Sequence, residues 1–292
     1  MNELHPGLVT AAATTAITLG ETDFPLPAPG ECLCVITSVT GPSYRPLGAA
    51  MVVASDGSRR GSLSSGCIEA DVVRHAITAL RQGRGTVLRY GKGSPFMDLQ
   101  LPCGGGLEVT LVPDPGAGQI AAARRNLRNR QDATLTLPSG QRLLLRPRPH
   151  LMILGSGPEA AALFAMARAG GMCTDWHCSA AETPPGAHAL TGTGWPERLI
   201  PDARTAIALF FHDHHQEPPL LARALTSPAF YIGALGSARA HADRCAALGQ
   251  MGLGRAQTDR MAWPFGLVAH ARDPQAIAAG VLAQIHDHAR LF

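Results

Sequence analysis

The sequence predicts a mixed α/β protein in which an N-terminal α+β domain is followed by a domain with a doubly wound parallel sheet. Three observations predict it. The chain has 292 residues, which is enough for two domains. Strand-like segments separated by glycine-rich loops crowd its first part. Near the middle, a short apolar strand runs through a glycine turn into an alanine-rich helix, as at the start of doubly wound domains.

Composition limits the class of protein. Hydrophobic residues make up 46% of the chain and charged residues 16%, which favours a packed globular protein and excludes a disordered one. A net charge of +3 is too small to indicate nucleic acid as a partner. Apolar runs such as residues 206–211 have the length of a strand and none approaches that of a spanning helix, so no membrane partner is expected.

The N-terminus and the cysteines indicate the compartment. The first residues lack the basic region of a secretory signal. Seven cysteines are an odd number, and their spacing forms no zinc motif, so we expect a reduced, cytoplasmic protein without a metal site. His212, His214 and His215 raise the alternative of a metal site, but adjacent histidines point apart, which favours a surface or interface loop.

The first domain contains one predicted helix among several strands. Residues 68–81 carry apolar side chains at helical intervals, and Gly83 ends the helix. Apolar, β-branched runs bounded by glycine and proline predict the strands, which are residues 31–39, 49–54, 85–90 and 107–112.

The chain is predicted to divide into residues 1–115, a connector at 116–148 and residues 149–292. Proline and glycine from position 113 to 116 mark the end of the first domain. Within the connector, a polar segment is a candidate short helix, and a hairpin is expected around Ser139 and Gly140.

The second domain opens with strand residues 151–154 and the turn that begins at Gly155. Gly155 permits the tight turn, Gly157 lets a ligand approach the backbone, and Ala160 allows the helix to pack closely on the strand. Further strand-like segments follow at 205–211 and 229–234, so the domain is predicted to be Rossmann-like.

A glycine turn alone is weak evidence for a bound dinucleotide. An acidic residue about 20 positions on, at the end of the second strand, usually holds the ribose. Asp175 is the candidate, but the strand is expected to continue through Trp176, and His177 or Cys178 would then take the ribose position. The sequence therefore favours a scaffold without NAD(P) chemistry. The alternative is an NAD(P)-dependent oxidoreductase, and the helix N-terminus could still hold a phosphate.

Two cysteines stand in glycine loops. Cys67 follows Gly66 at the predicted start of the helix, where the helix dipole lowers the pKa of a thiol. Cys103 precedes Gly104 and Gly105, whose backbone N–H groups no side chain shields. The alternative is that both are small buried side chains, and Glu69 would then simply compensate the helix dipole.

Taken together, the motifs of this sequence resemble those of the XdhC/CoxI family. The order and spacing match in residues 40–51, 61–69 and 101–109, and again in residues 154–157, 211–214, 231–237 and 264–267. The resemblance covers nearly the whole chain. The sequence departs from the family pattern at Ser65, where a glycine is frequent, and at Pro42, where a serine is frequent.

The resemblance implies an accessory role rather than an enzyme with turnover. Members of the family are cytosolic proteins that bind the molybdenum cofactor (molybdopterin) and protect it. They help it to receive a terminal sulfur from a cysteine desulfurase, and they insert it into an apo molybdenum hydroxylase such as xanthine dehydrogenase. We also expect a homo-oligomer.

The resemblance and the chemistry of the cargo together suggest which residues bind it. Glycine N–H groups and the guanidinium of Arg45 suit a phosphate and the edge of a pterin, and a thiolate suits the metal or its sulfur. No catalytic residue is predicted. The expected cofactor-binding residues are Cys103, Gly104, Gly105, Cys67, Gly66, Arg45, Glu69, Gly155 and Gly157.

Overall fold

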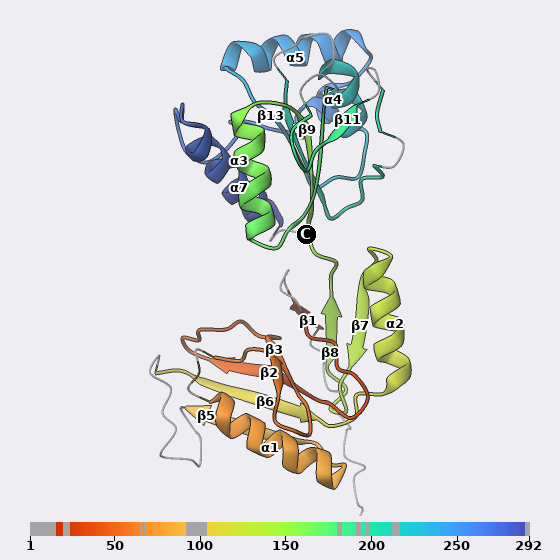
Figure 1. The fold of residues 1–292 in the computed structure, drawn as a ribbon, viewed down its shortest axis with the longest axis vertical. Coiled ribbons are helices and arrows are strands. Elements are labelled where there is room, and N and C mark those ends of the chain that lie inside the picture. The colour runs from red at the N-terminus through yellow and green to blue at the C-terminus, as the bar shows by residue number, and fades with distance from the viewer. Residues whose placement is uncertain are drawn as a thin grey trace, which may run out of the picture. The chain divides into compact units, whose positions relative to one another are not determined.

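The computed structural model folds into two compact units, Met1–Pro147 and Arg148–Phe292 (Figure 1). The structure describes residues 16–19, 24–64, 66, 68–91, 104–179, 183–190, 194–196, 199–211 and 217–289.

The first unit is built on a five-stranded antiparallel sheet with β2 at its centre. The strand order is β4-β3-β2-β6-β5. The four strands predicted from apolar runs are all present, and β4 was not predicted. Their bounds are Cys32–Thr40 for β2, Ala50–Val53 for β3, Arg59–Gly61 for β4, Thr86–Gly91 for β5 and Gly106–Val112 for β6.

Both faces of β2 are buried, which explains why its sequence is a continuous apolar run rather than an alternating one. Helix α1 (Glu69–Gln82) covers the face that carries Cys34 and Ile36, as Figure 1 shows. Leu33 and Val35 point to the other face and into a second core.

Residues 116–148, expected as a connector, form the layer that covers this second face. They fold into helix α2 (Ala117–Arg128) and the hairpin of β7 (Ala133–Thr136) and β8 (Arg142–Leu145). Strand β1 (Ala16–Leu19) pairs in parallel with β8, which gives a three-stranded sheet in the order β1-β8-β7. This layer contributes to the second core and belongs to the first unit.

The second unit contains a six-stranded parallel sheet in the order β11-β10-β9-β12-β13-β14. Numbered within the domain, this is the strand order 3-2-1-4-5-6 of the Rossmann fold, so the predicted fold class is confirmed. The strand bounds are His150–Gly155 for β9, Cys173–Ser179 for β10, His188–Leu190 for β11, Thr205–Phe210 for β12, Tyr231–Ala234 for β13 and Met261–Ala262 for β14.

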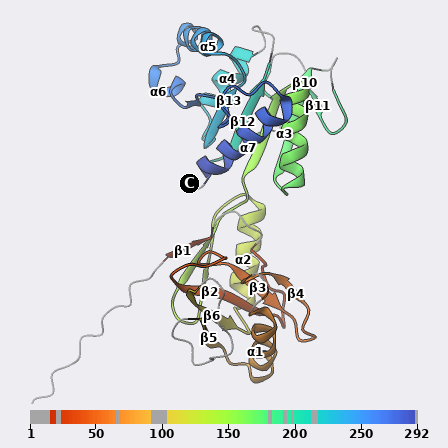
Figure 2. The same ribbon diagram turned by 90° about the vertical axis from the view of Figure 1, so that its left-hand side faces the viewer.

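Helices cover both faces of this parallel sheet. Helices α3 (Pro158–Ala169) and α7 (Pro274–Ala289) lie side by side on one face, and α4 (Glu217–Leu225) and α5 (Ala238–Gln250) cover the other (Figure 2). The short helix α6 (Arg255–Thr258) precedes β14. Among the described residues, no helix has the length and apolar character needed to cross a membrane.

The turn after β9 requires glycine at its first position. Gly155 has φ +110°, and a Cβ atom there would overlap the carbonyl of Phe210 at the end of β12. The same carbonyl accepts a hydrogen bond from the N–H of Ser156 at 3.0 Å. The indole of Trp176 donates to the carbonyl of Gly155 at 2.8 Å. Three strands thus meet at this turn.

We expect Gly155→Ala to lower the free energy of unfolding of the second unit by at least about 2 kcal/mol, since the new side chain adds overlap to an unfavourable φ. Trp176, Trp195 and Trp263 are the only tryptophans of the chain, so tryptophan fluorescence in urea reports on this unit alone. The matched control is Gly249→Ala, within α5 and facing open space. It should be neutral or stabilise by about 1 kcal/mol or less. Equal stability of the two variants would contradict the proposed constraint.

Candidate functional site

One end of the five-stranded sheet gathers most of the predicted site residues. Strands β2 and β4 end there, at Thr40 and Gly61, and β3 and β6 begin there, because neighbouring strands are antiparallel. The loops that leave this end carry Arg45, Gly66, Glu69, Gly104 and Gly105. Cys67 and Cys103 lie outside the described residues, but each adjoins a described glycine in these loops.

Glu69 is buried and organises the loop before α1. Only 3% of the residue is exposed. Its carboxylate accepts hydrogen bonds from the backbone N–H of Ser64 at 2.8 Å and of Leu63 at 3.3 Å. The hydroxyls of Ser64 and Ser62 donate to it at 2.5 and 3.2 Å. This carboxylate therefore does more than compensate the helix dipole.

The same contacts set the charge of Glu69. Burial by itself raises the pKa of the carboxyl, but the hydrogen bonds from Ser64 and Ser62 outweigh it and leave the pKa below its ordinary value. The hydroxyl oxygen of Ser64 in turn accepts from the N–H of Gly66 at 3.1 Å. The chain up to Gly66, the residue before Cys67, is thus fixed by an ionised carboxylate.

The serines of this network were missed by sequence reasoning. Ser62 and Ser64 precede the carboxylate by seven and five residues. The sequence signal that could have revealed them is a pair of hydroxyl residues just before a helix that has an acidic residue in its first turn.

The three glycines of these loops differ in what their missing side chains allow. A Cβ on Gly105 would overlap the carbonyl of Pro42, so packing of the two loops already requires glycine there. Gly66 and Gly104 have φ values of +106° and +71°, and a Cβ on either would meet no atom of the described residues within 4 Å. Among the described residues, nothing therefore covers the backbone at Gly66 and Gly104 on the side of the missing Cβ atom.

Arg45 supplies the cation of the loop that contacts Gly105. The hydroxyl of Ser43 donates to the carbonyl of Arg45 at 2.8 Å, which shapes the turn. The Nε atom of Arg45 is buried and has no hydrogen-bond partner within the described part of the chain. The neighbouring Tyr44 is 59% exposed. The loop thus presents a guanidinium beside an exposed aromatic ring.

The glycine turn of the second unit is less suited to an anion. Gly157 has φ +113° and precedes α3. Pro158 at the start of the helix has no N–H to donate. Glu159 adds a carboxylate in the first turn, and its Oε2 atom is buried without a partner among the described residues. A negative charge at this position opposes the binding of a phosphate.

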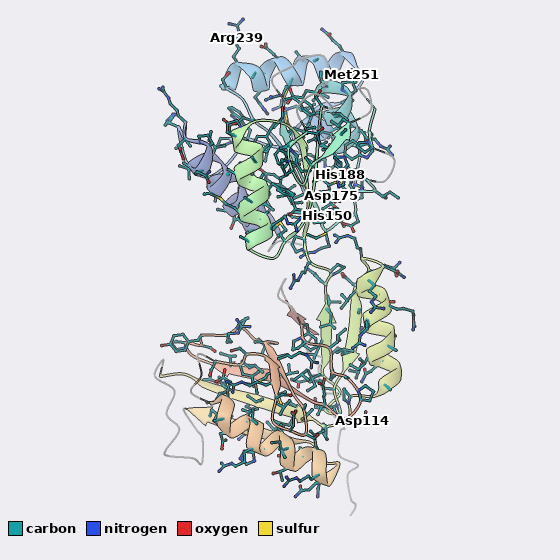
Figure 3. The ribbon with its side chains drawn as sticks, viewed as in Figure 1. Asp114, His150, Asp175, His188, Arg239 and Met251 are labelled. Carbon is teal, nitrogen blue, oxygen red and sulfur yellow. The ribbon has the colours of Figure 1, made fainter. Side chains whose placement is uncertain are left out.

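The predicted ribose position was wrong. Strand β10 continues to Ser179, so His177 and Cys178 lie within it, and the position after the strand falls outside the described residues. Asp175 pairs in register with Met152 and contacts His150 at 2.8 Å (Figure 3). This places its carboxylate roughly 10 Å from the carboxyl ends of the strands, where a nucleotide would bind.

Neighbouring histidines complete this part of the sheet. His177 lies beside His188, with ring centroids 5.2 Å apart, and burial followed by the charge of His188 lowers the pKa of His177. His212, His214 and His215, for which a metal was the alternative, lie outside the described residues.

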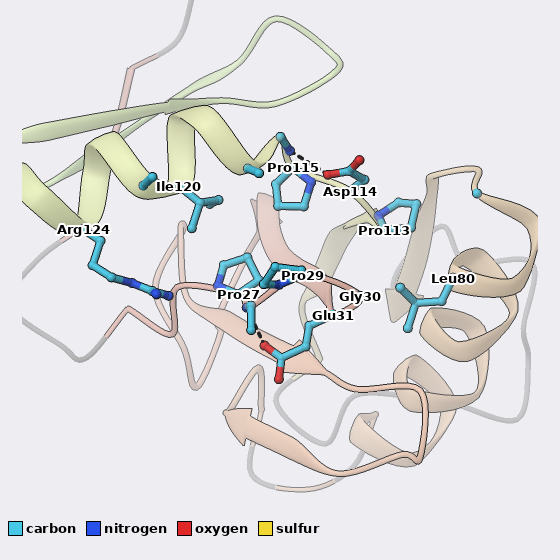
Figure 4. A pocket seen from close by; sticks show the side chains of 15 residues that line it. Pro27, Pro29, Gly30, Glu31, Leu80, Pro113, Asp114, Pro115, Ile120 and Arg124 are labelled. Carbon is cyan, nitrogen blue, oxygen red and sulfur yellow. Dashed lines mark hydrogen bonds between the residues drawn. The ribbon is translucent and has the colours of Figure 1, made fainter.

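A cavity of about 530 Å³ lies at the opposite end of the five-stranded sheet (Figure 4). Its wall contains the apolar residues Pro27, Pro29, Leu80, Pro113 and Ile120 and the charged residues Glu31, Asp114 and Arg124. The described residues that line it include none of the predicted site residues. The cavity is therefore distinct from the glycine loops.

Comparisons with known proteins agree with this architecture. Residues 31–91 match the XdhC and CoxI family, and residues 151–285 match the XdhC Rossmann domain. A crystal structure of a xanthine dehydrogenase from Bacillus halodurans has the same fold, with a TM-score of 0.69 and 20% identity. The alignment covers 89% of this chain and 92% of that one.

Two curated relatives align over most of the chain. A probable xanthine dehydrogenase subunit of Bacillus subtilis (strain 168) is 23% identical in an alignment that covers 87% of this chain and 91% of the relative. The molybdenum cofactor insertion chaperone PaoD of Escherichia coli (strain K12) is 34% identical in an alignment that covers 88% of this chain and 82% of PaoD. With both parts of the fold matched, the chain belongs to the XdhC and CoxI family.

Proposed function

We propose that this protein is an accessory chaperone that binds the molybdenum cofactor and inserts it into an apo molybdenum hydroxylase of the xanthine dehydrogenase type. The observation that carries the proposal is the 34% identity, over 88% of the chain, to a relative named as a molybdenum cofactor insertion chaperone. The protein has no turnover of its own in this proposal.

The loops at one end of the five-stranded sheet suit this cargo. The cofactor has a phosphate, a planar pterin and a metal held by sulfur. The open backbone at Gly66 and Gly104 and the guanidinium of Arg45 offer donors for the phosphate and the pterin edge. Cys67 and Cys103 follow and precede these glycines in the sequence, and thiolates bind soft metals.

The proposal extends to the partners. While the chaperone holds the cofactor, a cysteine desulfurase supplies the terminal sulfur of the cofactor. The chaperone then binds the apoenzyme. We place these steps in the cytoplasm and propose that the chaperone is a homo-oligomer. Gly155 and Gly157 belong to the other unit, and we assign their turn a scaffold role because Glu159 occupies the helix N-terminus.

An NAD(P)-dependent oxidoreductase is the rival function. The strand order of the second unit is the one that binds dinucleotides elsewhere. However, Pro158 and Glu159 weaken the anion site, and Asp175 is paired with His150 away from the ribose position. These contacts favour the chaperone over the rival.

We expect Cys103→Ser to remove most of the molybdenum that copurifies from cells producing the cofactor, while the fold stays intact. Cys67→Ser should have a weaker effect of the same kind. Metal analysis and the fluorescence of the oxidised pterin measure the cargo per folded chain. Cys173→Ser, an exposed cysteine of the second unit, is the control. Full loading of the Cys103 variant would refute the assigned role.

We expect Glu69→Gln to loosen the loop of residues 62–66 and to lower cargo loading. The side chain of glutamine would place an NH₂ donor among the four groups that donate hydrogen bonds to Glu69. The buried donors left without an acceptor would lower the free energy of unfolding by about 1–3 kcal/mol. Faster amide hydrogen exchange at Leu63 and Ser64 is the measurement. Glu108→Gln, which removes only a partly exposed ion pair with Arg89, should change exchange little.

The pH dependence of that variant has a definite sign. The pKa of Glu69 is lowered in the folded protein, so its stabilisation is complete above the ordinary glutamate pKa of roughly 4.3 and is lost as pH falls through the lowered value. The stability difference between wild type and Glu69→Gln should therefore shrink in acid. A constant difference down to the acid unfolding of the wild type would contradict the role of the charge.

The rival function is tested by titration with NADH and NADPH. We expect no saturable change in the fluorescence of either dinucleotide, because the helix N-terminus carries a carboxylate in place of a phosphate site. A dissociation constant of about micromolar order would instead support a preformed dinucleotide site and the oxidoreductase.

A further inference from the structure

A second cavity, of about 450 Å³, lies in the Rossmann unit beside the edge strand β14. Helix α5 contributes His241 and Cys245 to its wall, Trp263 follows β14, and α7 contributes Gln284 and His288. None of these residues takes part in the proposed cargo site.

His241 and Cys245 lie one helical turn apart and face each other. The Sγ atom of Cys245 is 3.7 Å from the Nε2 atom of His241. Zinc bonds of about 2.3 Å to sulfur and 2.0–2.1 Å to nitrogen, at a tetrahedral angle, place the two donor atoms roughly 3.6 Å apart. The pair thus already has the spacing of two ligands of one metal ion.

The imidazole of His241 is held in place by an aromatic ring. It stacks on the indole of Trp263, with centroids 4.5 Å apart and an interplanar angle of 21°. This contact fixes the plane of the ring while its Nε2 atom faces Cys245.

Most charged side chains near His241 and Cys245 already have partners of their own. Arg244 forms a buried ion pair with Glu217 at 2.8 Å. Arg260, which also lines the cavity, donates hydrogen bonds to the backbone carbonyls of Ser227 and Ala229. Asp259 adds a carboxylate to the wall.

His288 presents a further donor atom in the same cavity. Its Nδ1 atom donates a hydrogen bond to the carbonyl of Gln284 at 2.9 Å, which leaves Nε2 as the ring nitrogen available to a ligand. Metal-binding histidines commonly show this arrangement. Its ring also packs edge-on against Tyr231.

The described residues contain no preassembled group of three metal ligands. A metal held by Cys245 and His241 would thus keep coordination positions for His288, water or an incoming ligand. Such a site is open and exchangeable, unlike a closed structural zinc site.

We propose that Cys245 and His241 bind one thiophilic d¹⁰ metal ion, Zn²⁺ or an ion of similar chemistry. The sulfur–metal bond forms as the S–H bond of Cys245 breaks, and the proton leaves to solvent. The oxidation state of the metal does not change. The site is separate from the cargo loops, so it stands or falls independently of the chaperone function.

The test uses the full chain with Cys67, Cys103 and Cys173 replaced by serine. Of the other cysteines, Cys32, Cys34 and Cys178 are buried, which leaves Cys245 as the reactive thiol. Titration with Cd²⁺ should produce a saturable ultraviolet thiolate-to-metal charge-transfer band, with one ion bound and one proton released per chain.

Two variants in this background decide the assignment. Cys245→Ser should abolish the band, and His241→Gln should weaken binding about tenfold or more. Unchanged far-ultraviolet circular dichroism and urea midpoints verify that each variant is folded. Absence of the band in the parent, its persistence without Cys245, or unchanged affinity in the folded His241 variant would each overturn the proposal.

Discussion

The geometry of the candidate cargo site depends on one buried carboxylate. Glu69 belongs to the first turn of α1, but its hydrogen-bond partners lie in the loop that precedes the helix. The core under α1 fixes the helix, and the carboxylate transmits that position to Gly66 through Ser64. The loop before α1 is thereby held in one conformation by hydrogen bonds to a residue of the helix.

In the second unit, a buried ion pair fixes the position of one helix relative to another. Arg244 of α5 and Glu217 of α4 are 7% and 2% exposed and join two helices on one face of the parallel sheet. A Cβ on Gly236 would lie 2.7 Å from the guanidinium of Arg244, so the arginine lies directly under the turn after β13. Removing one partner would strand a buried charge, which makes such pairs strong constraints on geometry even where their net stabilisation is small.

The elements that could be predicted are those whose own residues show a clear hydrophobic pattern. Residues 31–39 were recognisable as a short continuous apolar run between turn residues, and residues 68–81 by apolar side chains at helical intervals. The helix and the hairpin within residues 116–148 were also predicted. Their place over β2 was not, since these residues bury their apolar side chains against a partner far away in sequence. The extent of β10 also escaped prediction, because its last residues pair with β11. Likewise, the clash that fixes Gly105 involves Pro42 and appears only once the two loops meet.

The pairing of β1 with β8 has a consequence for biosynthesis. Ala16 is opposite Arg142, so the three-stranded sheet of the first unit joins an early strand to one made just before the second unit begins. During translation, β1 must wait for its partner strand to leave the ribosome, and closing so long a loop is entropically slow. The three-stranded sheet of the first unit can therefore be completed only when nearly all of that unit has been synthesised.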